Sequence, residues 1–183
     1  TTAANGENII LGGSVDTDNA SMWVVVFHPD TVFGIIPKGS KAGFSLQDLG
    51  VQTIDDGSGG RMQAYRTYMT WKAGLAVRDW RAIVRVPNID RSLLNATGTG
   101  SSAVLPDLLF QAIDQIPDGI ISMGRPAIFM DRSIRTKLRQ QMSNKVANST
   151  LSFTDVGGRK VMDFQGIPIM VSDALRANES LIT

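Results

Sequence analysis

The stretch that decides the fold runs from Thr31 to Ile89 and reads TVFGIIPKGSKAGFSLQDLGVQTIDDGSGGRMQAYRTYMTWKAGLAVRDWRAIVRVPNI. Residues 61–72 alternate with a period of two and are rich in aromatic and β-branched side chains, which predicts a strand. The preceding DDGSGG, at residues 55–60, is a strong signal for a hairpin or flexible turn. Because aromatic residues fall on both faces of the predicted strand, we expect both faces to be covered, by the fold or by a neighbouring molecule.

The sequence around this strand predicts further β-structure. SMWVVVF, at residues 21–27, is a continuous apolar run that is typical of a buried strand. A second strand is expected at residues 32–36 and a short one at 51–54, with a loop over 38–49 between them. A further strand is predicted at residues 80–86, before Pro87.

The second half of the chain predicts two amphipathic helices. Apolar residues recur at helical spacing from Leu105 to Ile116, with a proline at each end. Asp131 is placed to cap a second helix over residues 133–142. Strands are expected at residues 125–130 and as a final pair, at 160–164 and 167–171. The fold class is therefore α+β, a mostly antiparallel sheet with two amphipathic helices.

The composition excludes several kinds of chemistry. The 183 residues include no cysteine and one histidine, His28, which excludes disulfides, thiol catalysis, multi-histidine metal sites and a histidine relay. No cofactor is predicted. The net charge of +1 favours no specific nucleic-acid binding. No apolar run reaches the roughly 18 residues of a membrane span, and no signal peptide is visible. Because the first residue is Thr1, we expect this chain to be a piece of a longer protein.

Two motifs resemble catalytic elements, but a structural interpretation is favoured for both. GIIPKGSK, at residues 34–41, has the serine and lysine of a phosphate loop in reversed order and a proline inside the loop. Asp55 and Asp56 stand beside three glycines, which is typical of a solvated turn rather than a metal or acid–base pair. Asp79, between Arg78 and Arg81, is expected to pair with an arginine.

Arginine and aromatic residues alternate along the strands that follow the turn. Such a mixture can form a nucleic-acid surface, but Trp, Tyr and Arg are also enriched at the centres of protein interfaces. The small net charge favours the interface. The arginine and aromatic residues predicted for such an interface are Arg61, Arg66, Tyr68, Arg78, Trp80 and Arg81.

Five blocks of the sequence, in order, resemble the major capsid proteins of one group of tailed bacteriophages. They lie at Ala3–Ile10, Ser21–Gly43, Arg61–Asp90, Met123–Gln141 and Val161–Leu175. Preserved order and spacing make this resemblance far more specific than any single block. Such coat proteins have the Hong Kong 97 fold, in which an N-terminal arm, an extended hairpin and a spine helix precede a peripheral and an axial domain.

The resemblance implies a domain organisation. The chain offers no candidate for the spine helix, so the arm, the extended hairpin and the spine helix are expected to be missing with an upstream half. Residues 1–30 would be a remnant of the peripheral domain with the strand that leads onward. Residues 31–175 would be mainly axial domain, and residues 176–183 a truncated C-terminal segment.

The resemblance implies a structural function and no enzymatic one. Copies would assemble as hexamers and pentamers into an icosahedral shell that encloses DNA, built in the bacterial host cytoplasm and found in the virion. The resemblance adds Lys38, Lys41, Asp55 and Asp56 to the residues expected to contact a neighbouring subunit. Scaffolding, protease, portal and decoration proteins are implied partners, with no membrane. The alternatives are a metal-dependent enzyme that uses Asp55, Asp56 or Asp79, and a nucleic-acid-binding module built on the arginine–aromatic strands.

Overall fold

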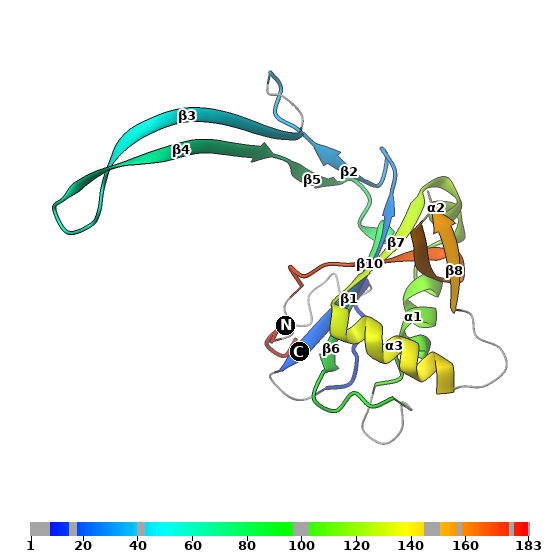
Figure 1. Ribbon diagram of the computed structural model, residues 1–183. Coiled ribbons are helices and arrows are strands. Elements are labelled where there is room, and N and C mark those ends of the chain that lie inside the picture. Colours follow the sequence, from blue (N-terminus) through cyan, green and yellow to red (C-terminus); the bar gives the residue numbers. More distant parts are fainter. Residues whose placement is uncertain are drawn as a thin grey trace. The chain divides into compact units, whose positions relative to one another are not determined.

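The chain divides into two compact units, one formed by residues 1–32 and 77–183 and the other by residues 33–76. The computed structural model (Figure 1) describes residues 8–14, 18–39, 43–96, 103–144, 151–156, 159–175 and 178–182.

The first unit is built on β1 (Asn19–Phe27), whose apolar run is buried along most of its length. It pairs antiparallel with β6 (Ile83–Asp90) and with β7 (Arg125–Met130). A three-residue 3-10 turn, η2 (Trp80–Ala82), precedes β6. The strand predicted from residue 80 therefore begins three residues late, because the Asp79 side chain accepts a hydrogen bond from the Arg81 backbone N–H and so caps this turn.

The sheet continues beyond β7 with the C-terminal strands. β10 (Ile167–Val171) pairs parallel with β7 and antiparallel with β9 (Arg159–Phe164), which pairs with β8 (Leu151–Val156). The sheet is thus mostly antiparallel, as predicted, and the final strand pair lies where the sequence placed it.

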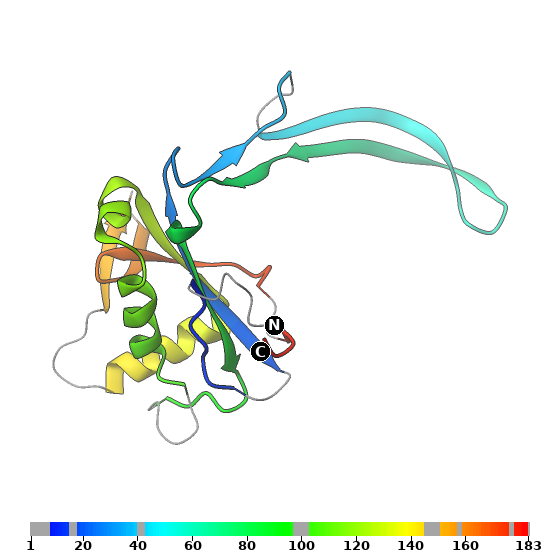
Figure 2. The same ribbon diagram turned by 180° about the vertical axis from the view of Figure 1, so that it is seen from behind.

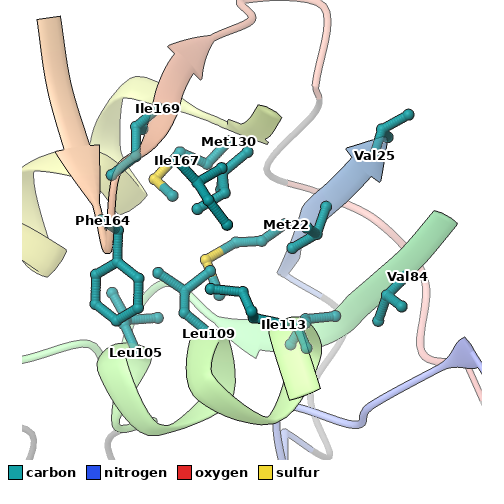
Figure 3. Packing of buried hydrophobic residues seen from close by; sticks show 14 of the residues in the cluster. Met22, Val25, Val84, Leu105, Leu109, Ile113, Met130, Phe164, Ile167 and Ile169 are labelled. Atoms are coloured by element: carbon teal, nitrogen blue, oxygen red, sulfur yellow. The ribbon is translucent and has the colours of Figure 1, made fainter. Parts of the chain in front are cut away.

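The helices cover this sheet with their apolar stripes. α1 (Leu105–Asp114) and α3 (Arg132–Asn144) are the two predicted amphipathic helices, and α2 (Asp118–Met123) is a short helix that was not predicted. α1 and α3 lie side by side, as Figure 2 shows from behind. Figure 3 shows Leu105 and Leu109 of α1 beside Phe164 in the core. The predicted α+β class is confirmed.

Gln141 is a buried polar side chain that joins three segments near the start of α1. Its Nε2 atom donates to the carbonyl oxygens of Asn95, at 3.2 Å, and Ala103, at 3.0 Å. Its Oε1 atom accepts from the backbone N–H of Leu105 at 2.9 Å. The side chain is fully buried, so it satisfies an N-terminal backbone donor of α1 that water cannot reach.

We expect Gln141→Leu to lower the free energy of unfolding by about 2–3 kcal/mol, because buried backbone groups lose their partner. Urea denaturation followed by circular dichroism measures this change. Gln140→Leu is the matched control, since Gln140 is exposed on the same helix. A loss below about 0.5 kcal/mol for Gln141→Leu, the range of ordinary surface substitutions, would show that the network is not stabilising.

The second unit consists of two pairs of strands. β2 (Val32–Ile35) lies beside β5 (Gly74–Val77). β3 (Gly43–Asp55) and β4 (Arg61–Lys72) form a two-stranded antiparallel sheet of their own.

The β3–β4 hairpin corrects two predictions. The loop predicted over residues 38–49 is strand from Gly43 onward, and an extended hairpin, which was expected to be missing from this chain, is present, with strands of 13 and 12 residues. The apolar alternation of β3 is weak, because polar residues dominate the strand and a bulge breaks its period. Among the described residues the longest helix is α3, with 13 residues, so no spine helix is seen there.

Candidate functional site

The β3–β4 hairpin presents two different faces because residues opposite each other in an antiparallel pair point to the same side. Phe44 lies opposite Trp71, and Leu46 lies opposite Met69. Towards the turn, Val51 lies opposite Tyr65 on the same side. These six residues form what we call the apolar hairpin face.

A β-bulge makes this face continuous. The register shifts between Asp48 and Val51, so that three steps along β3 match two along β4. Gly50 has a positive φ of 66° in this bulge, and its N–H donates to Oδ1 of Asp48 at 2.9 Å. If β3 were a regular strand without the bulge, Val51, an odd number of residues from Phe44 and Leu46, would point to the opposite side from them.

The apolar hairpin face is exposed to solvent. Trp71 is 74% exposed, Phe44 65% and Tyr65 86%, and the other three residues are also more than half exposed. Two exposed strands cannot bury their own side chains, and a two-stranded hairpin is at best marginally stable alone. Among the described residues no segment covers either face of the predicted aromatic strand, and a neighbouring molecule is the other cover that the sequence predicted.

The opposite face of the hairpin is more polar. Ser45 lies opposite Thr70 and Gln47 opposite Tyr68. Arg66, also on this side, donates from Nη1 to Oε1 of Gln52 at 3.3 Å. The predicted interface residues Tyr68 and Arg66 thus share one face and do not lie on the apolar one.

The turn of the hairpin is held by its two acids. Oδ1 of Asp55 accepts from the N–H of Gly57 at 2.9 Å. Oδ1 of Asp56 accepts from Ser58 at 2.8 Å and from Gly60 at 2.9 Å. These bonds confirm the prediction of a turn. Within the described part of the chain no group of three or more His, Asp or Glu residues is placed to hold a metal ion.

Three of the predicted interface residues, Arg78, Trp80 and Arg81, follow β5 and belong to the first unit. Asp79 accepts from Nε of Arg81 at 3.0 Å and from Nη2 at 2.9 Å, and this side-chain pair holds the pKa of Asp79 below its usual value. The predicted pairing of Asp79 with an arginine is confirmed. Arg78 contacts Oδ1 of Asp30 at 3.3 Å. Trp80 is 53% exposed.

Trp80 lines a pocket that the sequence did not predict. Trp23, Ile83 and Arg85 line it as well. The Cζ atom of Arg85 lies 5.1 Å from the centroid of the Trp23 ring, and its Nη2 atom contacts Oε2 of Glu179 at 2.8 Å. Trp23 and Glu179 lie 62 and 94 residues from Arg85 in the sequence. No local sequence pattern could therefore have indicated that these three residues meet.

The predicted interface residues are thus divided between the two units. Lys38 is exposed in a turn after β2, and Lys41 lies outside the described residues. The second unit also holds Asp55, Asp56, Arg61, Arg66 and Tyr68, whereas Arg78, Trp80 and Arg81 belong to the first. None of the six residues of the apolar hairpin face was among the predicted interface residues, and three of the six lie on β3.

No helix in the described residues is long and apolar enough to span a bilayer.

The fold is similar to that of a chain in a solved bacteriophage structure. A solved structure described as "Validated Near-Atomic Resolution Structure of Bacteriophage Epsilon15 Derived from Cryo-EM and Modeling" matches with a TM-score of 0.60 and 29% sequence identity. The match covers 96% of this chain and 53% of that chain, so this chain spans about half the length of its solved relative.

The family is identified by the sequence as a whole. The profile of the family described as "Major capsid protein GP7" matches residues 1–183, and the chain belongs to this family. The predicted resemblance to phage coat proteins is confirmed. Among curated proteins, none matches the chain.

Proposed function

We propose that this chain acts as a structural subunit of a bacteriophage capsid, in which many copies assemble non-covalently into an icosahedral shell that encloses DNA. Membership of the major capsid protein family and the likeness to a phage structure support this function. Its action is mechanical: each copy contacts its neighbours, and rings of copies at fivefold and sixfold positions multiply contacts that are individually modest.

The observation that carries this proposal is the exposed apolar hairpin face. Six apolar or aromatic side chains lie on one side of a two-stranded sheet, each more than half exposed. Monomeric soluble proteins rarely expose contiguous apolar patches beyond a few hundred Å² unless the patch binds something. Trp and Tyr are among the residues that contribute most at interface centres. A neighbouring copy that covers this face removes the apolar area from water and stabilises the hairpin.

The other predicted interface residues lie near the turn, before β3, on the opposite face of the hairpin or on the first unit. We propose that Arg61 and the turn acids Asp55 and Asp56 form a polar rim, with Lys38 and Lys41 from the segment before β3. Arg66 and Tyr68, on the opposite face, would lie at the margin of the contact. Arg78, Trp80 and Arg81 would contribute a separate contact from the first unit. Arg78 has an exposed acidic partner, Asp30, and such an exposed pair is weak enough to be exchanged. Arg81 keeps its bond to the less exposed Asp79 and would contribute the rest of its side chain.

The domain assignment and the partners extend the same proposal. Residues 1–30 would belong to the peripheral domain, residues 31–175 mainly to the axial domain, and residues 176–183 to a C-terminal segment. Assembly in the host cytoplasm, with scaffolding, protease, portal and decoration proteins, follows from the function of a coat subunit. Neither catalysis nor specific nucleic-acid binding is part of the proposal.

Electron microscopy of the protein, expressed with whatever natural sequence flanks these residues, tests the function. We expect closed particles of uniform size, because coat subunits assemble into closed shells. Co-expression with the neighbouring phage proteins is the second condition. Monomers or irregular aggregates under both conditions would contradict the proposal.

A further inference from the structure

The two long helices of the first unit carry opposite charges. Between residues 92 and 124 the sequence has three acids and no basic residue, and the acids are Asp107, Asp114 and Asp118. Between residues 132 and 154 it has five basic residues and no acid. The net charge of +1 for the whole chain therefore hides a strong local separation of charge.

The acidic residues of α1 lie on its exposed side. Leu105, Leu109 and Ala112 are fully buried, whereas Asp107 and Asp114 are exposed. Asp107 and Asp114 are seven residues apart, which is close to two helical turns, so both lie in one row opposite the buried stripe. Asp118, at the start of α2, is also exposed.

The basic residues of α3 form a corresponding row. Arg132, Arg135 and Arg139 follow the spacing i, i+3, i+7, which places them on one side of the helix. The buried residues Ile134 and Leu138 lie on another side. Arg132 contacts Asp173 at 3.2 Å, but both side chains are about 70% exposed (69% and 73%), so this pair is weak and can be exchanged.

The two rows also match in length. Asp107 to Asp114 and Arg132 to Arg139 each span seven residues, or about 10.5 Å along a helix axis at 1.5 Å per residue. Within one copy α1 and α3 contact each other, with their buried residues in the shared core. Each copy thus offers one acidic row and one basic row of the same length to its surroundings.

We infer that the arginine row of α3 in one copy docks against the acidic row of α1 in the next copy. The inference rests on the proposed shell function. It concerns a second contact surface, on α1 and α3, which is separate from the hairpin and whose partner is another copy of this chain. A head-to-tail contact between different surfaces generates a ring when the rotation closes. Charge complementarity of this kind steers association and selects one orientation, and like charges in the wrong register oppose it.

Charge reversal with rescue tests this contact. We expect Asp107→Lys with Asp114→Lys to raise the concentration needed for particle assembly at least tenfold, and Arg135→Glu with Arg139→Glu to do the same. All four substitutions in one chain restore the complementarity with the signs exchanged, so this chain is expected to assemble within about threefold of the original. Lys137→Glu is the control, because Lys137 lies on the other flank of α3, away from the arginine row.

The outcomes separate the inference from the proposed function. Normal assembly of both double variants, or failure of the folded fourfold variant, would overturn the inference and leave the shell function standing. A third outcome is that only the arginine double variant fails to assemble and that it also loses salt-dependent binding of duplex DNA. This result would assign the arginine row to nucleic-acid binding and would overturn the inference as well.

If no flanking sequence gives shells, the proposed function fails and sedimentation at low salt decides the inference. The lysine double variant then has two basic rows. The glutamate double variant has an acidic row on α1 and, on α3, a row of Arg132 with two glutamates whose net charge is negative. We expect the two to associate when mixed and to stay monomeric alone. No association in the mixture would overturn the docking of α3 on α1.

Discussion

Phe164→Ala is expected to lower the free energy of unfolding by about 3–5 kcal/mol, the range for removing a buried phenylalanine ring. Phe164, in β9, is fully buried, and its ring centroid lies 5.0 Å from that of Phe110. Figure 3 shows it beside Leu105 and Leu109 of α1. Alanine would leave a cavity where the C-terminal strands meet the helices, and urea denaturation measures the loss.

Phe44→Ala is the matched control for this substitution, because the residue type is the same and the environment is opposite. Phe44 is exposed on the hairpin, so its replacement is expected to change the free energy of unfolding by less than about 0.5 kcal/mol. A similar loss for both variants would show that the hairpin is part of the cooperative core. It would also weaken the proposal that a neighbouring copy covers the apolar hairpin face.

Replacing both Phe44 and Trp71 by alanine is expected to abolish particle assembly while leaving the fold intact. The two side chains lie opposite each other on the apolar hairpin face. If each contributes about 2 kcal/mol as an interface hot spot, their combined loss of about 4 kcal/mol raises the concentration needed for assembly by roughly several hundredfold. Light scattering over a protein concentration series measures this shift, and circular dichroism confirms that the variant is folded.

Tyr68→Ala supplies the comparison for the double variant. Tyr68 is an exposed aromatic residue of the same strand, but it lies on the opposite, more polar face. We expect a shift of less than about threefold, because a residue at the rim contributes little. Equal effects of the two variants would mean that both faces are covered in the shell, and no effect of either would remove the hairpin from the interface.

Several elements were predictable from the sequence because short-range periodicity encodes them. The apolar stripe of α1 needs only the spacing from Leu105 to Ile113, and the apolar run of β1 needs only its own residues. The period of two predicted for residues 61–72 places Tyr65 and Trp71, six residues apart, on one face, and the pairing with β3 confirms it. The turn acids Asp55 and Asp56 were interpreted correctly because their hydrogen bonds run to backbone groups within four residues.

The β3 strand was not predictable in the same way. Polar residues dominate the strand, so its apolar residues do not show a clear alternation. The bulge at Gly50 also moves the apolar residues from even-numbered positions before it to odd-numbered positions after it. A period of two counted along the sequence therefore fails across this point. Only the pairing with β4 reveals that Val51 shares a face with Phe44.

By itself the sequence determined the α+β class, the two amphipathic helices, the strand with aromatic residues on alternate positions, and membership of the capsid protein family. The tertiary structure alone decided which apolar residues are left exposed, and it brought together distant partners such as Asn88 with Ile182 and Arg85 with Glu179. The physical reason is the distance along the sequence over which each property is determined. Helix and strand patterns arise from residues a few positions apart, whereas the burial of a side chain depends on which distant segment packs over it. For the apolar hairpin face no described segment of the chain does so.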